Sequence, residues 1–268
     1  MSDPDLKLLV GAVAVIGLGG AAWYYWDEIF PPPVPETPTY MPVPEQPVAD
    51  EGPQYPMPEP LGDPDTGELV PLPTLDDSDG YFLLEIGGAF GPAIESLLVR
   101  EAVIDRLVAS VDSLTRSKLP EQIRPVGGLQ ASFKADPGSD DTLVLGENSY
   151  ARYDALVEQL FYADMDTVYD TYRRFYPLFQ KAYEQLGYPD AYFNDRLVEV
   201  IDHLLEAPVP AEPILLVRPN VLYVFADPEL EALSSGQKLM LRMGPDNSAN
   251  LKRFLDQFRD RLTANRPF

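Results

Sequence analysis

The sequence has no cysteine, one histidine and two tryptophans. The absence of cysteine excludes disulfides, thiol nucleophiles, zinc–thiolate sites and iron–sulfur clusters, and it is compatible with either a reducing or an oxidising compartment. Basic residues are also scarce, with 20 Lys and Arg against 43 Asp and Glu, a formal net charge of −23. Binding to nucleic acid or to anionic headgroups through a basic patch is therefore not expected, because such binding needs clustered cations.

The negative charge is concentrated in the first part of the chain. Up to Val99 the only basic residue is Lys7, against 17 acidic residues, whereas 19 basic residues face 26 acidic ones from Arg100 onward. The second part thus carries a net charge of −7, which is ordinary for a folded domain and favours solubility.

Long apolar runs are absent except near the amino terminus. The 19 residues from Leu8 to Trp26 carry no charge and would span about 28 Å as a helix, close to the thickness of a bilayer core. Aromatic side chains are favoured at the membrane–water interface, and the run ends in four of them: Trp23, Tyr24, Tyr25 and Trp26. We therefore expect a short tail over 1–7 and a transmembrane helix over 8–26, in contact with the lipid bilayer.

Two alternatives compete with a membrane anchor. A cleaved signal peptide would use Gly20 and Ala22 as the small residues of its cleavage site, but it usually begins with several positive charges, and here one Lys accompanies two Asp. A buried core helix would need an amphipathic neighbour to cover it. With Lys7 as the cation nearest to the run, the amino terminus is predicted to be inside and the carboxy-terminal domain periplasmic or extracytoplasmic, on the cytoplasmic (inner) membrane.

Residues 27–78 are predicted to form an acidic, proline-rich and disordered tether. Fifteen of the 29 prolines lie between Pro31 and Pro73, and this stretch has no basic residue. Proline fixes φ and removes a backbone donor, so an extended spacer is expected that could reach roughly 130 Å if fully stretched. The tether either holds the domain at a distance from the membrane or is a passive linker, and a third alternative is a proline-rich ligand for a peptide-binding module.

From residue 79 to 268 the sequence predicts one globular, mainly α domain. Apolar residues recur at helical spacing over 100–119, 148–161, 164–186, 194–206, 235–243 and 247–262. Two β-prone pieces, 214–217 and 221–225, can pair as a short hairpin. Pro177 lies within the 164–186 stretch and should either kink that helix or begin a second one.

Aromatic residues are concentrated in the domain, with 13 Tyr or Phe between Tyr150 and Phe193. Their spacing favours burial in the core. If part of the stripe is exposed, it can form a partner groove that stacks on sugars or receives a peptide. The residues of that groove would be Tyr169, Tyr172, Tyr176, Phe179 and Tyr183.

Five short strings occur in an order that resembles a known family: Tyr150-Ala-Arg-Tyr-Asp154, Leu186-Gly-Tyr-Pro189, Ala207-Pro-Val-Pro210, Leu216-Val-Arg-Pro219 and Leu241-Arg-Met-Gly-Pro245. The chain resembles, over about residues 76–262, the bacterial domain-of-unknown-function family numbered three thousand and fourteen. The resemblance implies a bacterial, membrane-anchored domain of unknown function, and it assigns no catalytic residue.

Motifs for catalysis or ion binding are weak, so no catalytic, cofactor-binding or metal-binding residue is predicted. His203 lies among helical acids, which is more typical of a charge-paired face than of a metal site or catalytic triad. Ser235 and Lys238 match S-x-x-K, but Ser234 and Gln237 fit a helix-capping box better. Asp164, Asp166 and Asp170 match part of a calcium loop that lacks its glycine and its final glutamate, and they are better explained as helix-capping acids.

The sequence therefore favours a membrane-anchored envelope protein with a non-enzymatic binding or scaffolding domain. An envelope protein or a cell-wall glycan is the expected partner. The alternative is a hydrolase of cell-wall polysaccharide that uses two carboxylates, because such a site requires only two acids at a suitable separation.

Overall fold

The computed structural model describes residues 52–59, 71–127, 133–138, 142–210, 213–219 and 222–264. All of them belong to one unit, Glu51–Phe268, while Met1–Asp50 forms another. The predicted transmembrane helix 8–26, its four interfacial aromatic residues and much of the tether lie outside the described residues. Within the described ranges, no helix combines the length and apolar character that a bilayer crossing requires.

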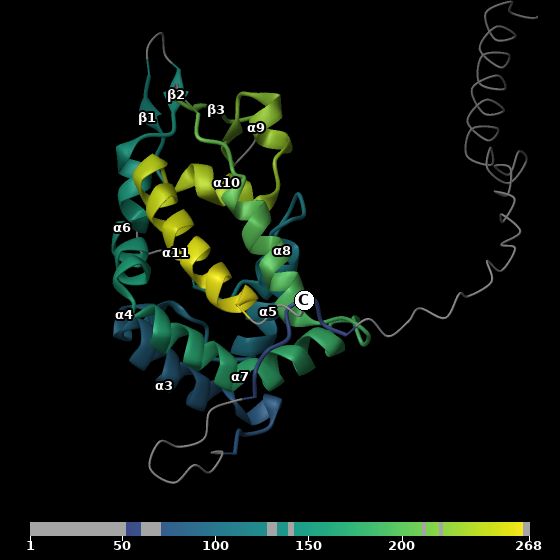
Figure 1. The fold of residues 1–268 in the computed structure, drawn as a ribbon. Coiled ribbons are helices and arrows are strands. Elements are labelled where there is room, and N and C mark those ends of the chain that lie inside the picture. Colours follow the sequence, from purple (N-terminus) through teal and green to yellow (C-terminus); the bar gives the residue numbers. More distant parts are fainter. Residues whose placement is uncertain are drawn as a thin grey trace, which may run out of the picture. The chain divides into compact units, whose positions relative to one another are not determined.

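The described residues form a mainly helical domain with a small antiparallel sheet, as predicted (Figure 1). The α-helices are α3 (Asp79–Phe90), α4 (Pro92–Leu97), α5 (Val103–Ser113), α6 (Glu147–Tyr162), α7 (Met165–Gln185), α8 (Phe193–Leu205), α9 (Pro228–Ala232), α10 (Ser235–Arg242) and α11 (Pro245–Thr263). The 3-10 turns are η1 (Leu75–Asp77) and η2 (Glu121–Ile123), and the strands are β1 (Asp136–Pro137), β2 (Leu143–Val144), β3 (Leu215–Val217) and β4 (Val224–Phe225).

The four strands pair antiparallel in the order β1-β2-β3-β4. The predicted hairpin corresponds to β3 and β4, which place Leu216 opposite Phe225. Strand β2 then joins this hairpin to β1, with Leu143 opposite Leu216. Leu216 and Phe225 are buried in a cluster with Leu241 of α10, so the sheet packs its inner face on a helix.

Helix α5 confirms the amphipathic stretch predicted within 100–119, but it is shorter. Val103 and Ile104 are fully buried at its start. Two free N–H groups at this start, of Ala102 and Val103, donate to the carboxylate of Asp79, each at 2.8 Å. A side chain more than twenty residues upstream thus accepts the hydrogen bonds that the side chain of a local N-cap residue usually accepts.

Helix α7 is continuous through Pro177, so a second helix does not begin there. Pro177 is exposed, and its neighbours Tyr172, Phe175 and Phe179 are buried. The hydrogen bond lost at the proline lies on the outer face, while core packing on both sides of it holds one helix together.

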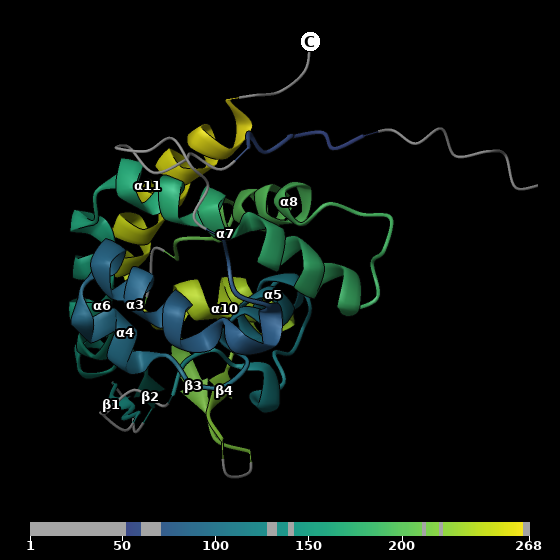
Figure 2. The ribbon, with the colours of Figure 1, turned by 90° about the horizontal axis from the view of Figure 1, so that it is seen from below.

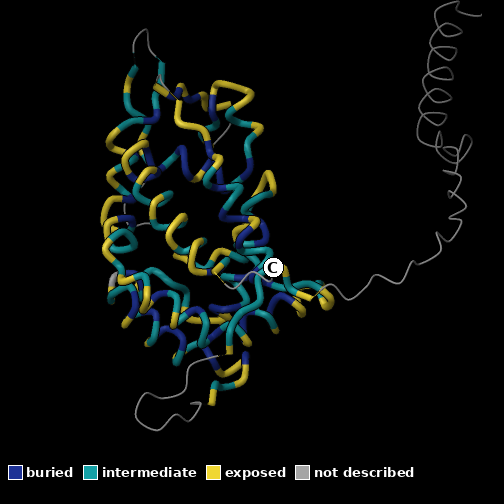
Figure 3. The backbone as a smooth tube through the Cα atoms, in the orientation of Figure 1, coloured by how far each residue is buried: buried dark blue, intermediate teal, exposed yellow. Residues whose placement is uncertain are grey.

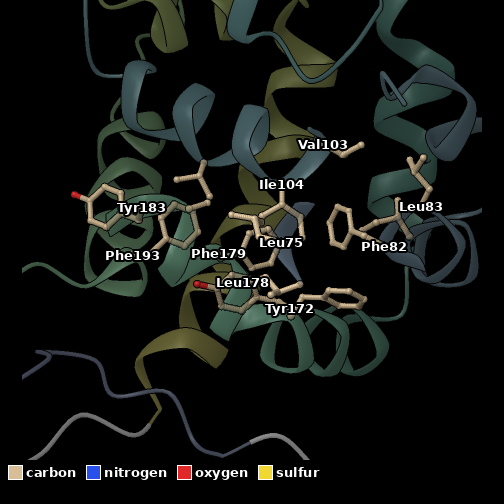
Figure 4. Packing of buried hydrophobic residues seen from close by; sticks show 14 of the residues in the cluster. Leu75, Phe82, Leu83, Val103, Ile104, Tyr172, Leu178, Phe179, Tyr183 and Phe193 are labelled. Atoms are coloured by element: carbon tan, nitrogen blue, oxygen red, sulfur yellow. The ribbon is translucent and has the colours of Figure 1, made fainter. Parts of the chain in front are cut away.

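The main core cluster is rich in aromatic side chains contributed by α3, α7 and α8 (Figure 4). Phe82 meets Phe175 edge-on with a centroid separation of 5.0 Å, and Phe179 stacks on Phe193 at 5.7 Å. Leu75 of η1 is only 3% exposed within this cluster. The packed part of the chain therefore includes residues upstream of Asp79, where the domain was expected to begin.

Helix α11 packs between α6 and α8, and α3, α5 and α7 lie together on another side of the domain (Figures 1 and 2). A second cluster, which includes Tyr153, Val157, Val200 and Met240, joins α6, α8 and α10. Most helices bury one side and expose the other (Figure 3). This arrangement brings the amino-terminal end of α8 next to α7.

Candidate peptide-binding site

The aromatic stripe of α7 lies mainly in the core. Tyr172, Phe179 and Tyr183 are each at most 8% exposed, whereas Tyr169 and Tyr176 are half-buried and pack against the same cluster. The three buried rings therefore line no open groove. Tyr172 nevertheless directs its hydroxyl at the amino-terminal end of α8, where it donates to the Asn194 side-chain oxygen at 3.2 Å.

Helix α8 is fixed at this end by a side chain of α7. The amide of Phe193, the first helical residue, donates to the Gln180 side-chain oxygen at 2.8 Å, and the Gln180 amide nitrogen donates to the carbonyl of Ala191 at 2.8 Å. The first bond satisfies an N–H group that a helix start leaves without a partner, and the second ties Gln180 to the segment before the helix. They hold Asn194 and Asp195 in place on the surface of α7.

Residues 52–59 of the tether lie against this position. The backbone N–H groups of Gln54 and Tyr55 donate to the two carboxylate oxygens of Asp195, each at 2.8 Å. An acidic side chain in the first turn of a helix is also stabilised by the helix dipole. Asp195 thus accepts hydrogen bonds from two consecutive amide groups of a segment about 140 residues upstream.

Asn194 makes the second contact with the tether. Its side chain is fully buried, and its amide nitrogen donates to the carbonyl of Tyr55 at 2.8 Å. Its oxygen accepts from Tyr172, so the whole amide is engaged. If the tether were removed, the amide nitrogen would lose this partner, and a buried donor without a partner costs about 1–3 kcal/mol.

Arg173 makes the third contact. Its Nε donates to the carbonyl of Glu59 at 2.7 Å, and a second guanidinium nitrogen donates to the same oxygen. The side chains of Tyr55 and Met57 pack against the main core cluster. We call the residues Tyr172, Arg173, Asn194 and Asp195 the tether site. It contacts the backbone of this segment, which bends at Gln54 and Tyr55, at three points.

Tyr172 and Tyr176 remain protonated at physiological pH. Burial raises the pKa of Tyr172 well above its usual value, and the neighbouring Tyr176 adds to this effect. Burial also raises the pKa of Tyr176 to about 12. Tyr172 therefore acts as a hydrogen-bond donor to Asn194 over the whole physiological range.

Sequence reasoning missed Asn194 and Arg173, and it treated Asp195 as one of several acids on a helix. One signal was available for Asn194, because it lies on the same helix face as Val198 and Ile201, four and seven residues later. An amide on a buried apolar face needs a polar partner, although the sequence does not indicate which one.

Two cavities lie elsewhere in the described part. One, of about 280 Å³, is lined mainly by apolar and proline residues of α6, α10, α11 and the segment that follows α8, including Tyr150, Pro208, Leu241 and Gly244. Among the described residues, no carboxylate lines it. Three of the five strings that carry the family resemblance contribute residues to this cavity.

The other cavity, of about 520 Å³, is open and has Glu158 and Asp164 in its lining. Asp164 caps α7, as predicted, by accepting from the backbone N–H and the hydroxyl of Thr167 at 2.9 and 2.6 Å. These bonds lower the pKa of Asp164. A glycosidase acid needs the opposite shift, so Asp164 does not suit that role.

The weaker sequence motifs have structural roles. The Nε2 of His203 lies 2.8 Å from the Ser234 hydroxyl, which caps α10 by accepting from the Gln237 N–H at 3.1 Å. The Gln237 side-chain nitrogen donates to the His203 carbonyl at 3.2 Å. Lys238 pairs with Glu231 at 3.0 Å. Among the residues that the structure covers, no three His, Asp or Glu side chains are grouped as a metal ion would require.

Taken from fold to site, the described part is a helical domain that holds a segment of its own proline-rich tether. Residues 103–259 match the family described as "Protein of unknown function (DUF3014)". The match covers more than half of the chain, and the chain belongs to this family. No curated protein and no solved structure matches the chain.

Proposed function

We propose that this chain is a membrane-anchored binding or scaffolding protein of the cell envelope, and that the tether site is a peptide-binding site. In this proposal residues 8–26 cross the cytoplasmic membrane with the amino terminus inside, and the domain lies on the periplasmic or extracytoplasmic side. The uncharged run, its terminal aromatic residues and the position of Lys7 support the anchor and its orientation.

The observation that carries the binding function is the way in which the tether site contacts residues 52–59. Asp195 and Asn194 bind backbone amide and carbonyl groups, and Arg173 binds a further carbonyl. Recognition of backbone groups, with side chains packed beside them, is how binding modules hold extended peptides. These contacts support binding, and they involve no catalytic step.

A thiol-protection experiment tests the site. Because the sequence has no cysteine, an introduced thiol is the only one that is labelled. Met57→Cys places a thiol on the docked segment, and Leu84→Cys places one at a position that is 70% exposed. In the full chain in detergent micelles, we expect maleimide to label Cys at 57 at least about tenfold more slowly than Cys at 84, because hydrogen bonds to charged groups contribute about 1.5–3 kcal/mol each.

The matched variants are Asp195→Asn and Asp190→Asn. Asp195→Asn turns an amide group toward one of the two backbone donors and should raise the labelling rate at 57 about tenfold. Asp190 is exposed and its replacement should leave the rate unchanged. Equal labelling of 57 and 84 would refute docking, and loss of protection on dilution would show that the segment comes from a second copy.

Further measurements test the membrane attachment, the orientation and the non-enzymatic proposal. A reporter fused to the carboxy terminus should read extracytoplasmic, and the chain should leave the membrane fraction only with detergent. A cytoplasmic reading would overturn the orientation. Release of sugar from purified cell-wall material by the purified chain would overturn the non-enzymatic proposal in favour of a carboxylate-dependent hydrolase.

A further inference from the structure

Residues 52–59 of the same chain occupy the tether site in the structure. Resting on the proposed function, we infer that the tether site is an exchangeable recognition site for a peptide that bends at two consecutive residues, as the chain does at Gln54 and Tyr55. These two residues keep their N–H groups, and prolines flank them. Such a peptide binds in trans by displacing residues 52–59.

The ligand class follows from the backbone contacts. Asp195 accepts from the amides of Gln54 and Tyr55, so neither position of a ligand can be proline. Asn194 donates to the carbonyl of the second of these residues. Asp195 and Asn194 therefore fix both the register and the direction of the peptide.

The prolines of the segment fit the same geometry. Pro53, Pro56 and Pro58 have no amide hydrogen, so they leave no donor unpaired where the site offers no acceptor. Proline also holds the chain extended before binding, which lowers the entropy lost on docking. The aromatic side chain of Tyr55 and the apolar side chain of Met57 pack on the core cluster and select those positions.

The docked segment is attached less deeply than the chain that follows it, which allows exchange. Gln54 and Glu59 are exposed, and their contacts can open without disturbing the interior. Leu75, in contrast, is 3% exposed in the main core. Eleven residues, 60–70, separate the docked segment from Pro71, so the segment can leave while η1 stays packed.

The buried side-chain amide of Asn194 favours a site that is occupied by a peptide over one that is empty. When the segment leaves, the amide nitrogen of Asn194 loses the Tyr55 carbonyl, and a peptide that brings its own carbonyl restores this bond. The competitor works against a resident segment whose effective concentration is of millimolar order for a short linker. Peptides at about that concentration are therefore the suitable probe.

The test uses the full chain with Met57→Cys and an acetylated, amidated peptide of residues 52–59 as the probe. Since labelling reports the released segment, the rate at 57 should rise linearly with peptide concentration and double when that concentration equals the Kd of the peptide. The matched control is the same peptide with an N-methyl group on its tyrosine nitrogen. It keeps the side chain but lacks one donor to Asp195, and it should leave the labelling rate unchanged.

The outcomes separate this inference from the proposed function. If Cys at 57 is protected but neither peptide changes its rate, the segment docks permanently, and the exchange inference is overturned while docking stands. If both peptides accelerate labelling equally, the Asp195 contact does not select the ligand, and the assigned ligand class is wrong. If Cys at 57 is not protected in the absence of peptide, the proposed function fails first.

Discussion

Gly244 lies directly against the ring of Tyr150: a Cβ atom on Gly244 would be 2.5 Å from the ring Cγ. Gly244 also has φ 84°, in the left-handed region that favours glycine. The ring cannot move away freely, because its hydroxyl donates to the carbonyl of Leu145 at 2.8 Å. This contact joins the start of α11 to the start of α6.

We predict that Gly244→Ala lowers the free energy of unfolding by about 1–3 kcal/mol, because the added methyl group overpacks the contact and the backbone is strained. Urea unfolding of the full chain in micelles, followed by circular dichroism, measures this change. Gly88 in α3 is the control, since a Cβ there meets nothing within 4 Å. Gly88→Ala should stabilise by about 0.4–1 kcal/mol, and equal effects of the two substitutions would contradict the argument.

Asp112 is the centre of a buried ionic cluster. Its side chain is 5% exposed and accepts from Arg196 Nε at 3.0 Å, and it also pairs with Arg116. Asp112→Ala should cost on the order of 3 kcal/mol in unfolding free energy, because it leaves the 16% exposed Arg196 without its main buried partner. The same urea unfolding measurement applies.

The control for Asp112 is the exposed pair of Arg124 and Glu121, separated by 3.8 Å. Glu121→Ala should change stability by less than about 1 kcal/mol. A loss at Asp112 no larger than that at Glu121 would show that the cluster contributes little.

Glu231 should give stability a specific dependence on pH. Burial alone would raise its pKa, but hydrogen bonds from Lys238 and from the Phe225 N–H, with the charge of Lys238, lower it overall. A lowered folded pKa means stability that is present above the unfolded value, about 4.3, and is lost as pH falls through the folded value. The stability difference between wild type and Glu231→Gln should therefore shrink below about pH 4.3.

Chemical unfolding at a series of pH values between 3 and 7 measures this difference. In a Lys238→Met background the part of the difference that depends on pH should largely disappear, because the main partner is gone. A difference that stays constant down to pH 3 would contradict the assignment.

The helices were predictable because their apolar residues recur with helical spacing. Val103, Ile104 and Val111 of α5 are examples, and α6, α7, α8, α10 and α11 lie within two residues of their predicted bounds. The start of α5 was not predictable in this way. Its cap is Asp79, and a contact across more than twenty residues leaves no local pattern.

The tether site was predictable only in its parts. The aromatic stripe included Tyr172, which donates a hydrogen bond to Asn194. The ligand itself could not be inferred, because proline-rich composition predicts an extended chain and not where that chain docks. The bond between Asn194 and Tyr55 depends on three-dimensional proximity alone.

Docking should shorten the free part of the tether. With 52–59 bound, 25 residues (27–51) remain between the predicted membrane helix and the domain, and release extends this to 45 residues (27–71). At about 3.1 Å per residue the maximum reach changes from about 80 to about 140 Å. Energy transfer from a donor dye on Leu84→Cys to acceptor lipids in vesicles should therefore fall in the Asp195→Asn variant.

The Asp190→Asn variant should give the same energy transfer as wild type. Unchanged transfer in Asp195→Asn, together with fast labelling at position 57, would mean that the released segment does not alter the distance between domain and bilayer.

The attachment of the tether at Asp195 also determines where a mechanical load enters the domain. If the amino terminus is anchored as proposed, tension from it reaches the first turn of α8 before it reaches Leu75. The surface hydrogen bonds there should break first, and the release of residues 52–59 then lengthens the free chain. A brief force would therefore extend the tether without unfolding the core.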